Sequence, residues 1–139
     1  MTTRIGVDVQ SVEEVEKSLN CFGSRYLERV YDKTECTFAE LRPRTAGAFL
    51  AGHFAAREAV LKLLEIPDAV ASWRDIVLID SNSSPIVELR GESAQTALTL
   101  GIFQILMSIS SCSDHAIAVA VADVSPFERG EVDLVEPPD

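Results

Sequence analysis

A single stretch, Phe49 to Glu65 (FLAGHFAAREAVLKLLE), constrains the fold of this chain more than any other. Wound at about 3.6 residues per turn, it places apolar side chains around most of its circumference, and such a helix is a buried one. Glu58 lies inside it, between Phe54 and Leu61 on neighbouring turns. A buried carboxylate is costly unless a cation, a metal ion or several hydrogen-bond donors compensate it. The stretch therefore predicts a central helix that carries a compensated acid.

Two kinds of compensation fit this acid. Lys62 follows Glu58 by four residues, on the same helical face and in the more favourable order for an ion pair. An internal Glu58–Lys62 pair is the simpler interpretation, because most such pairs are structural. A metal site is the other interpretation, and it requires a second acid from elsewhere in the chain.

The length and composition are typical of a single soluble globular domain. The chain has 139 residues, of which 47% are hydrophobic and 24% are charged. No run approaches the roughly 18 uninterrupted apolar residues of a membrane span. The N-terminus MTTRIGVDV lacks the apolar segment of a secretory signal. We therefore expect a cytoplasmic protein with no membrane partner.

The charge and the cysteines exclude several classes of function. The formal net charge is −10, and a protein that binds nucleic acid needs a basic surface. The three cysteines are Cys21, Cys36 and Cys112, and their odd number and spacing support neither a disulfide framework nor a zinc site. Part of the acidity lies in the stretch ERGEVDLVEPPD at the C-terminus. We therefore expect a domain over residues 1–124 and a loosely packed acidic tail over residues 125–139.

The N-terminal half reads as one strand followed by helices. Residues 4–9 (RIGVDV) alternate in the period of a half-buried strand, with Asp8 on the face opposite Ile5, Val7 and Val9. Ser11 and Glu14 have the spacing of a capping box at the start of a first helix. Further helices are predicted over 24–30, over 33–41 with Thr34 as its cap, and from Thr45 until shortly before Pro67.

The C-terminal half reads as two hairpins that flank a helix. The first hairpin joins 76–80 to 86–89 through a turn at 81–84, and a helix follows over 92–100. The second joins 104–111 to 116–122, whose sequence AIAVAVA is typical of a strand covered on both faces. Pairing of this hairpin with the first strand would bring Asp8 into the centre of the sheet. The predicted fold class is α+β, with helices packed on one face of a small, mostly antiparallel sheet.

Several segments together resemble a known family. GVDV, FGSRYLERVY, FAAREAVLK, WRDI, SIS and DHAIAVAVA occur in an order and at separations similar to those of holo-acyl-carrier-protein synthases, which are short 4′-phosphopantetheinyl transferases. The resemblance extends to about Asp123. Its most specific part is the pairing of G-[IV]-D-[IV] with F-A-x-[KR]-E-A-x-x-K.

The resemblance implies a reaction and its site. Such enzymes move the 4′-phosphopantetheine arm of coenzyme A to a serine of an acyl carrier protein and release adenosine 3′,5′-bisphosphate. Asp8 and Glu58 match two carboxylates that hold Mg²⁺, and Lys62 matches a lysine near the phosphates. Glu58 is also a possible general base. The coenzyme-binding segments include the positions of His53, Ser110 and Ser111. The family further implies a homotrimer with coenzyme A between neighbouring subunits.

Some positions depart from the family pattern. His53 stands where the family usually has Arg, the residues 63–67 (LLEIP) lack a glycine, and the motif S-[IL]-S-H lacks its histidine after Ser110. The first helix carries several acids, which leaves Arg25 and Arg29 as the candidate contacts for an acidic carrier protein. An alternative function is therefore a relative of the same fold that binds a carrier protein or its arm without transferring it. Arg57 either faces solvent or serves the phosphate site.

Overall fold

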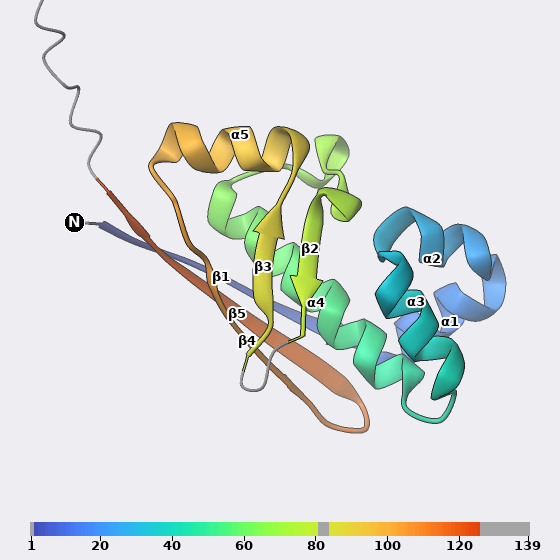
Figure 1. Cartoon of the computed structure of the whole chain (residues 1–139). Helices are drawn as coiled ribbons and strands as arrows, with labels where there is room; N and C mark the ends of the chain where they lie inside the picture. Colours follow the sequence, from blue (N-terminus) through green and yellow to red (C-terminus); the bar gives the residue numbers. More distant parts are fainter. Residues whose placement is uncertain (1, 81–83, 126–139) are drawn as a thin grey trace, which may run out of the picture.

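The structure is a computed structural model, and it describes residues 2–80 and 84–125. The acidic tail beyond residue 125 and most of the turn at 81–84 lie outside the described residues. Within these ranges, five α-helices pack with two antiparallel sheets (Figure 1). The predicted α+β class is confirmed, but the strands form two sheets where the sequence predicts one. No helix in the described ranges is long and apolar enough to span a membrane.

The elements follow the predicted order. The larger sheet has the strand order β1-β5-β4, the smaller sheet pairs β2 with β3, and two 3₁₀ turns, η1 and η2, join α4 to β2. The bounds are β1 Thr2–Ser11, α1 Val12–Phe22, α2 Ser24–Val30, α3 Lys33–Leu41, α4 Ala46–Leu64, η1 Asp68–Val70, η2 Trp73–Asp75, β2 Ile76–Ile79, β3 Ile86–Leu89, α5 Gly91–Leu100, β4 Leu106–Ser111 and β5 His115–Val124.

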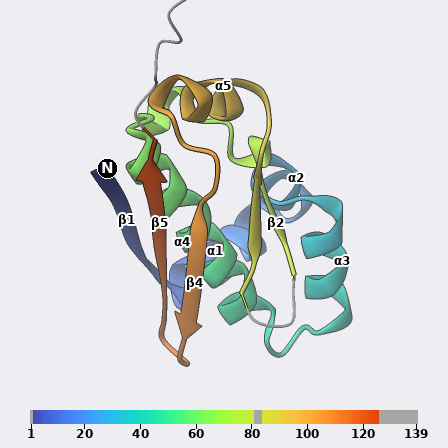
Figure 2. The same ribbon diagram turned by 60° about the vertical axis from the view of Figure 1, so that its left-hand side comes forward.

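The long helix α4 organises the molecule. It lies against the three-stranded sheet, while α1, α2 and α3 gather near its N-terminal end and α5 lies near its other end (Figures 1 and 2). Most of its residues are buried, including Leu50, Ala55, Val60 and Leu63. Its burial on several sides confirms the prediction made from its all-round apolar sequence.

Local signals set most helix ends. The Ser11 side chain accepts a hydrogen bond from the Glu14 backbone N–H and caps α1, as predicted. The predicted cap of α3 is wrong, because Asp32 rather than Thr34 caps it, in a reciprocal capping box with Glu35. Asp32 takes this position because its carboxylate reaches the backbone N–H of Glu35, three residues later.

The strand β1 lies at the edge of its sheet and not at the centre. β5 occupies the centre and pairs with both β1 and β4, with Ala118 opposite Asp8 on one side and Ile109 on the other. The prediction of a central Asp8 is therefore wrong. Of the two strands of the second hairpin, β5 pairs with β1, and β4 pairs with the other edge of β5. β1 is therefore an edge strand of this sheet.

The two faces of β1 are used in a way that its aliphatic residues do not suggest. Asp8 does lie opposite the aliphatic residues, but the covered face carries Gly6, while Ile5, Val7 and Val9 are exposed. Likewise, the alanines of β5 are buried but Ile117 is 40% exposed, so within the described chain this strand is not covered on both faces. Small residues face α4 because the helix backbone lies close to the sheet.

Gly6 makes this close approach possible. A Cβ atom at Gly6 would lie 1.8 Å from the Ala59 carbonyl oxygen of α4, far inside van der Waals contact. We therefore expect Gly6→Ala to force β1 and α4 apart and to lower the free energy of unfolding by about 3 kcal/mol. Urea denaturation measures the loss. Thr2→Ala, an exposed change on the same strand, is the control, and equal stability of the two variants would contradict the packing described here.

Candidate functional site

Asp8 reaches α4 through a lysine. The Lys62 Nζ donates to Asp8 Oδ1 at 2.9 Å and to the Val7 carbonyl oxygen at 3.0 Å. The other carboxylate oxygen of Asp8 accepts from the Gln10 side-chain amide at 2.6 Å. Asp8 forms a hydrogen bond that raises the pKa of Lys62. The strand acid is thus bound to a cation from the central helix.

The predicted Glu58–Lys62 pair is not formed. Glu58 is buried, and its Oε1 accepts instead from the Trp73 indole N–H at 3.0 Å. Among the described residues, the ion pair of Lys62 is with Asp8, and Glu58 has none. The long side chain of Lys62 reaches across to β1, where a carboxylate oxygen and a backbone oxygen both accept hydrogen bonds from its ammonium group.

Three carboxylates influence one another at this place. Burial raises the pKa of Glu58, the Trp73 hydrogen bond opposes that rise, and the carboxylates of Asp68 and Asp8 add to it. Asp68 begins η1, in the loop after Pro67, and the sequence analysis missed it. No periodic pattern marks a loop residue, so only its acidic type in the connection after α4 points to it. The result is a local excess of negative charge beside Lys62.

This charge excess fits a hard cation. Mg²⁺ prefers oxygen ligands and is usually held by one or two protein carboxylates, with phosphates and waters completing its shell. Asp8 and Glu58 supply such oxygens, and the Lys62 ammonium group already places a positive charge against Asp8. In the described ranges no group of three or more His, Cys, Asp or Glu residues is arranged to hold a metal ion. Because two carboxylates fill only part of the octahedral shell of Mg²⁺, a site here would also need oxygens from substrate or water.

The other predicted site residues are Ser110, Ser111 and His53. Ser110 and Ser111 end β4 and are exposed, and Ser111 shares the sheet face of Asp8 while Ser110 lies on the opposite face. His53 is buried in α4, and its Nδ1 lies 2.6 Å from Glu35 Oε2. The structure thus brings Asp8, Glu58 and Lys62 together, and it places His53 in a separate cluster.

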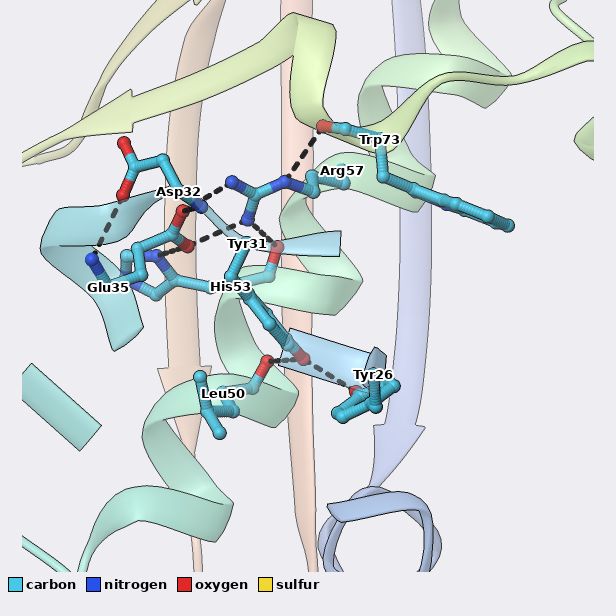
Figure 3. A network of polar contacts seen from close by, with 8 residues as sticks. All are labelled: Tyr26, Tyr31, Asp32, Glu35, Leu50, His53, Arg57 and Trp73. Carbon is cyan, nitrogen blue, oxygen red and sulfur yellow. Dashed lines mark hydrogen bonds and ion pairs between the residues drawn. The ribbon is translucent and has the colours of Figure 1, made fainter. Parts of the chain in front are cut away.

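That cluster is built around Arg57. Its side chain is fully buried, so the prediction that Arg57 faces solvent is wrong. Its role at a phosphate site stays a prediction. The guanidinium group donates to both oxygens of Glu35, and its Nε donates to the Trp73 carbonyl oxygen at 3.0 Å (Figure 3). Burial alone would raise the pKa of Glu35, but the hydrogen bonds from His53 and Arg57 lower it to about 2. Sequence reasoning missed Glu35 because its spacing marks only a helix start.

Trp73 also lines a groove. The groove has a volume of about 490 Å³ and runs between α1, α2 and α4. Its lining residues are Ser18, Phe22, Arg25, Tyr26, Arg29, Val30, Phe54 and Trp73. The lining is mostly apolar, and its two arginines are exposed. The groove therefore offers apolar contact and positive charge close to Glu58.

The comparisons with known proteins identify the family. Residues 4–120 match the family model of the 4′-phosphopantetheinyl transferase superfamily. The chain is 36% identical over 126 residues to the holo-acyl-carrier-protein synthase of Moorella thermoacetica, with 90% of this chain and 97% of that relative covered. The chain belongs to the holo-acyl-carrier-protein synthase family. The synthase of Dehalococcoides mccartyi is also similar, at 34% identity over 84% of this chain and 95% of the relative.

Solved structures agree with this assignment. The holo-acyl-carrier-protein synthase of Helicobacter pylori in complex with coenzyme A superposes with a TM-score of 0.72 at 29% identity, covering 86% of this chain and 99% of that one. The synthase of Neisseria meningitidis gives a TM-score of 0.73 at 26% identity, covering 86% and 97%. The chain thus spans nearly the full length of these synthases, and the α+β fold is that of the family.

Proposed function

We propose that this protein is a holo-acyl-carrier-protein synthase that transfers the 4′-phosphopantetheine arm of coenzyme A to a serine of an acyl carrier protein, in an Mg²⁺-dependent reaction. The juxtaposition of Asp8, Lys62 and Glu58 at the contact between β1 and α4 carries the proposal. The names of the similar synthases, and the coenzyme A complex of one of them, supply the substrate class.

The proposed chemistry assigns a task to each residue. The serine hydroxyl oxygen attacks the phosphorus that bears the pantetheine arm, the bond from that phosphorus to the bridging oxygen of the pyrophosphate breaks, and adenosine 3′,5′-bisphosphate leaves. Glu58 accepts the serine proton, directly or through water. Lys62 holds a positive charge beside the phosphate oxygens. When bound by Asp8 and Glu58, Mg²⁺ would neutralise charge that develops on those oxygens.

The groove beside Trp73 is the proposed docking surface for the carrier protein. Acyl carrier proteins are acidic, and the chain as a whole is acidic too, so docking needs a local basic patch. Arg25 and Arg29 supply it at the rim, while Phe22 and Phe54 supply apolar contact. The acidic residues Glu13 and Glu14 lie in the first turn of α1 and are not among the residues that line the groove.

The assay for this function is transfer to a carrier protein. The full chain is incubated with coenzyme A, Mg²⁺ and a panel of apo acyl carrier proteins, and each carrier is read by intact mass. The proposal expects a gain of one phosphopantetheine arm on at least one carrier, and none when EDTA removes the metal. No gain on any carrier would contradict it.

Lys62 and Mg²⁺ compete for Asp8 under this proposal. Because the Lys62 ammonium group occupies Asp8 Oδ1 at 2.9 Å, we expect Lys62→Met to bind Mg²⁺ about 10-fold more tightly and yet to transfer the arm at least about 10-fold more slowly. Calorimetry with Mg²⁺ and the intact-mass assay measure the two opposite effects. Lys17→Met, which removes an exposed ion pair, is the control. Weaker Mg²⁺ binding by Lys62→Met would contradict the competition.

A homotrimer is the proposed assembly. The outer face of the three-stranded sheet exposes aliphatic side chains on each strand, namely Ile5, Val7 and Val9 on β1, Leu106 on β4 and Ile117 on β5. Such a continuous apolar face favours contact with other copies of the chain. We expect Val7→Glu to yield monomers where the unmodified chain forms trimers, as light scattering after gel filtration measures. A Val7→Glu trimer would place the interface elsewhere.

A further inference from the structure

Trp73 is held from two sides by neighbouring residues of α4. Its backbone carbonyl oxygen accepts from Arg57 Nε at 3.0 Å, and its indole N–H donates to Glu58 Oε1 at 3.0 Å. Arg57 and Glu58 are consecutive in α4, so one helix turn fixes both the main chain and the side chain of Trp73. Trp73 begins η2, which together with η1 forms the regular structure of the connection between α4 and β2.

The Arg57 side of this arrangement is rigid. The guanidinium group is fully buried and donates to both carboxylate oxygens of Glu35, which also contacts His53 (Figure 3). The planar fork of an arginine bound at two oxygens has little freedom to rotate. The Nε–H of the same planar group therefore points in a fixed direction, and its hydrogen bond anchors the backbone carbonyl group of Trp73.

The ring of Trp73 is held by further contacts. Its centroid lies 6.1 Å from that of Phe54, and the guanidinium carbon of Arg29 lies 6.0 Å from it. The ring also forms part of the groove wall. With backbone and ring both fixed, the direction of the indole N–H is set before any substrate arrives.

We propose that Trp73 is the positioning residue of Glu58, and that the cluster of Glu35, His53 and Arg57 serves to hold it in place. The indole N–H is neutral, so it fixes one carboxylate oxygen and leaves the negative charge of Glu58 in place. A lysine partner would cancel that charge. The charge of Glu58 stays available to a metal ion or a proton. This inference rests on the proposed function, and it adds a role that neither the charge pattern nor the two metal-binding acids specify.

The first test reads the hydrogen bond itself, without any activity. The chain contains one tryptophan, so an NMR spectrum of the ¹⁵N-labelled protein shows a single indole N–H resonance. We expect this proton to exchange slowly with solvent and its resonance to move upfield in Glu58→Gln, because an amide oxygen accepts more weakly than a carboxylate. Glu65→Gln, an exposed change near the same helix end, should leave it in place. An unmoved resonance in Glu58→Gln would overturn the proposal.

The second test separates positioning from packing. Growth of a tryptophan auxotroph on benzothienylalanine replaces the single indole by a ring of the same shape without the N–H. We expect kcat for arm transfer to fall about 10-fold and the Mg²⁺ dissociation constant to rise about 10-fold, while KM for the carrier protein stays unchanged because the groove wall is preserved. The same protein grown on 5-fluorotryptophan, which retains the N–H, should keep the kcat of the unmodified enzyme.

The outcomes are distinguishable from a failure of the proposed function. If the unmodified chain modifies no carrier protein, the transfer proposal fails, while the indole resonance and the Mg²⁺ dissociation constant still decide the role of Trp73. If the chain is active and the benzothienyl protein matches it in kcat and in Mg²⁺ affinity, Trp73 is only a packing residue and the positioning role is overturned.

Discussion

Glu58→Gln is expected to slow arm transfer by about 1,000-fold, which corresponds to about 4 kcal/mol in the activation barrier. The amide keeps the size of the side chain and can still accept from the Trp73 N–H, so the local packing is preserved. It loses the negative charge that would bind Mg²⁺ and the basicity that would accept the serine proton. Initial rates from intact mass, at saturating coenzyme A, measure the change.

The same variant should not lose stability. Burial and the nearby carboxylates of Asp68 and Asp8 raise the pKa of Glu58, which means that the folded state disfavours its charged form. Removal of that charge at neutral pH therefore leaves the free energy of unfolding equal or higher. Glu65→Gln, which breaks only an exposed ion pair with Arg4, is the control for activity. A Glu58→Gln rate within about 10-fold of the unmodified rate would contradict the assigned role.

Arg57→Met is expected to lower the free energy of unfolding by about 4 kcal/mol, because it leaves the buried carboxylate of Glu35 without its main cation. The variant also removes the donor to the Trp73 carbonyl oxygen. Urea denaturation at pH 7 measures the loss. Arg29→Met, at an exposed arginine of α2, is the matched control and should change stability little. A loss below about 1 kcal/mol would contradict the description of Arg57 as a buried partner of Glu35.

This loss has a signature in its pH dependence. The folded-state pKa of Glu35 is about 2, below its ordinary value of 4.5, so its contribution to stability is fully present above about pH 4.5 and disappears as the pH falls toward 2. The difference corresponds to about 3 kcal/mol. The stability difference between the unmodified chain and Arg57→Met should therefore shrink over that window. A difference that stays constant from pH 5 to pH 2 would contradict the assignment.

The elements were predictable because each has a local signal. The burial of α4 follows from apolar residues around its circumference. The hairpin of β4 and β5 follows from an alternating stretch and an aliphatic stretch joined by a short polar loop. The cap at Ser11 follows from its spacing to Glu14. The cap of α3 failed because Thr34 and Asp32 are both good capping residues, and only the hydrogen bonds show which of them is used.

Contacts between distant segments were not predictable in the same way. Lys62 bonds to Asp8 rather than to Glu58, although Glu58 is its neighbour on the helix, because β1 lies within reach of its side chain. Arg57 gave no sign of its partner Glu35, which comes from another helix. The exposed face of β1 was also misleading, since aliphatic residues normally mark the covered face. The proximity of Asp8 and Lys62 was reached only through the family resemblance.

The most direct test of the central claim is calorimetry of coenzyme A binding with and without Mg²⁺. If Asp8 and Glu58 together hold a metal ion that binds the pyrophosphate, the unmodified chain binds coenzyme A tightly with Mg²⁺ and at least about 10-fold more weakly in EDTA, and Asp8→Asn removes that difference. Equal affinities of the unmodified chain in Mg²⁺ and in EDTA, or a metal effect that survives in Asp8→Asn, would contradict it.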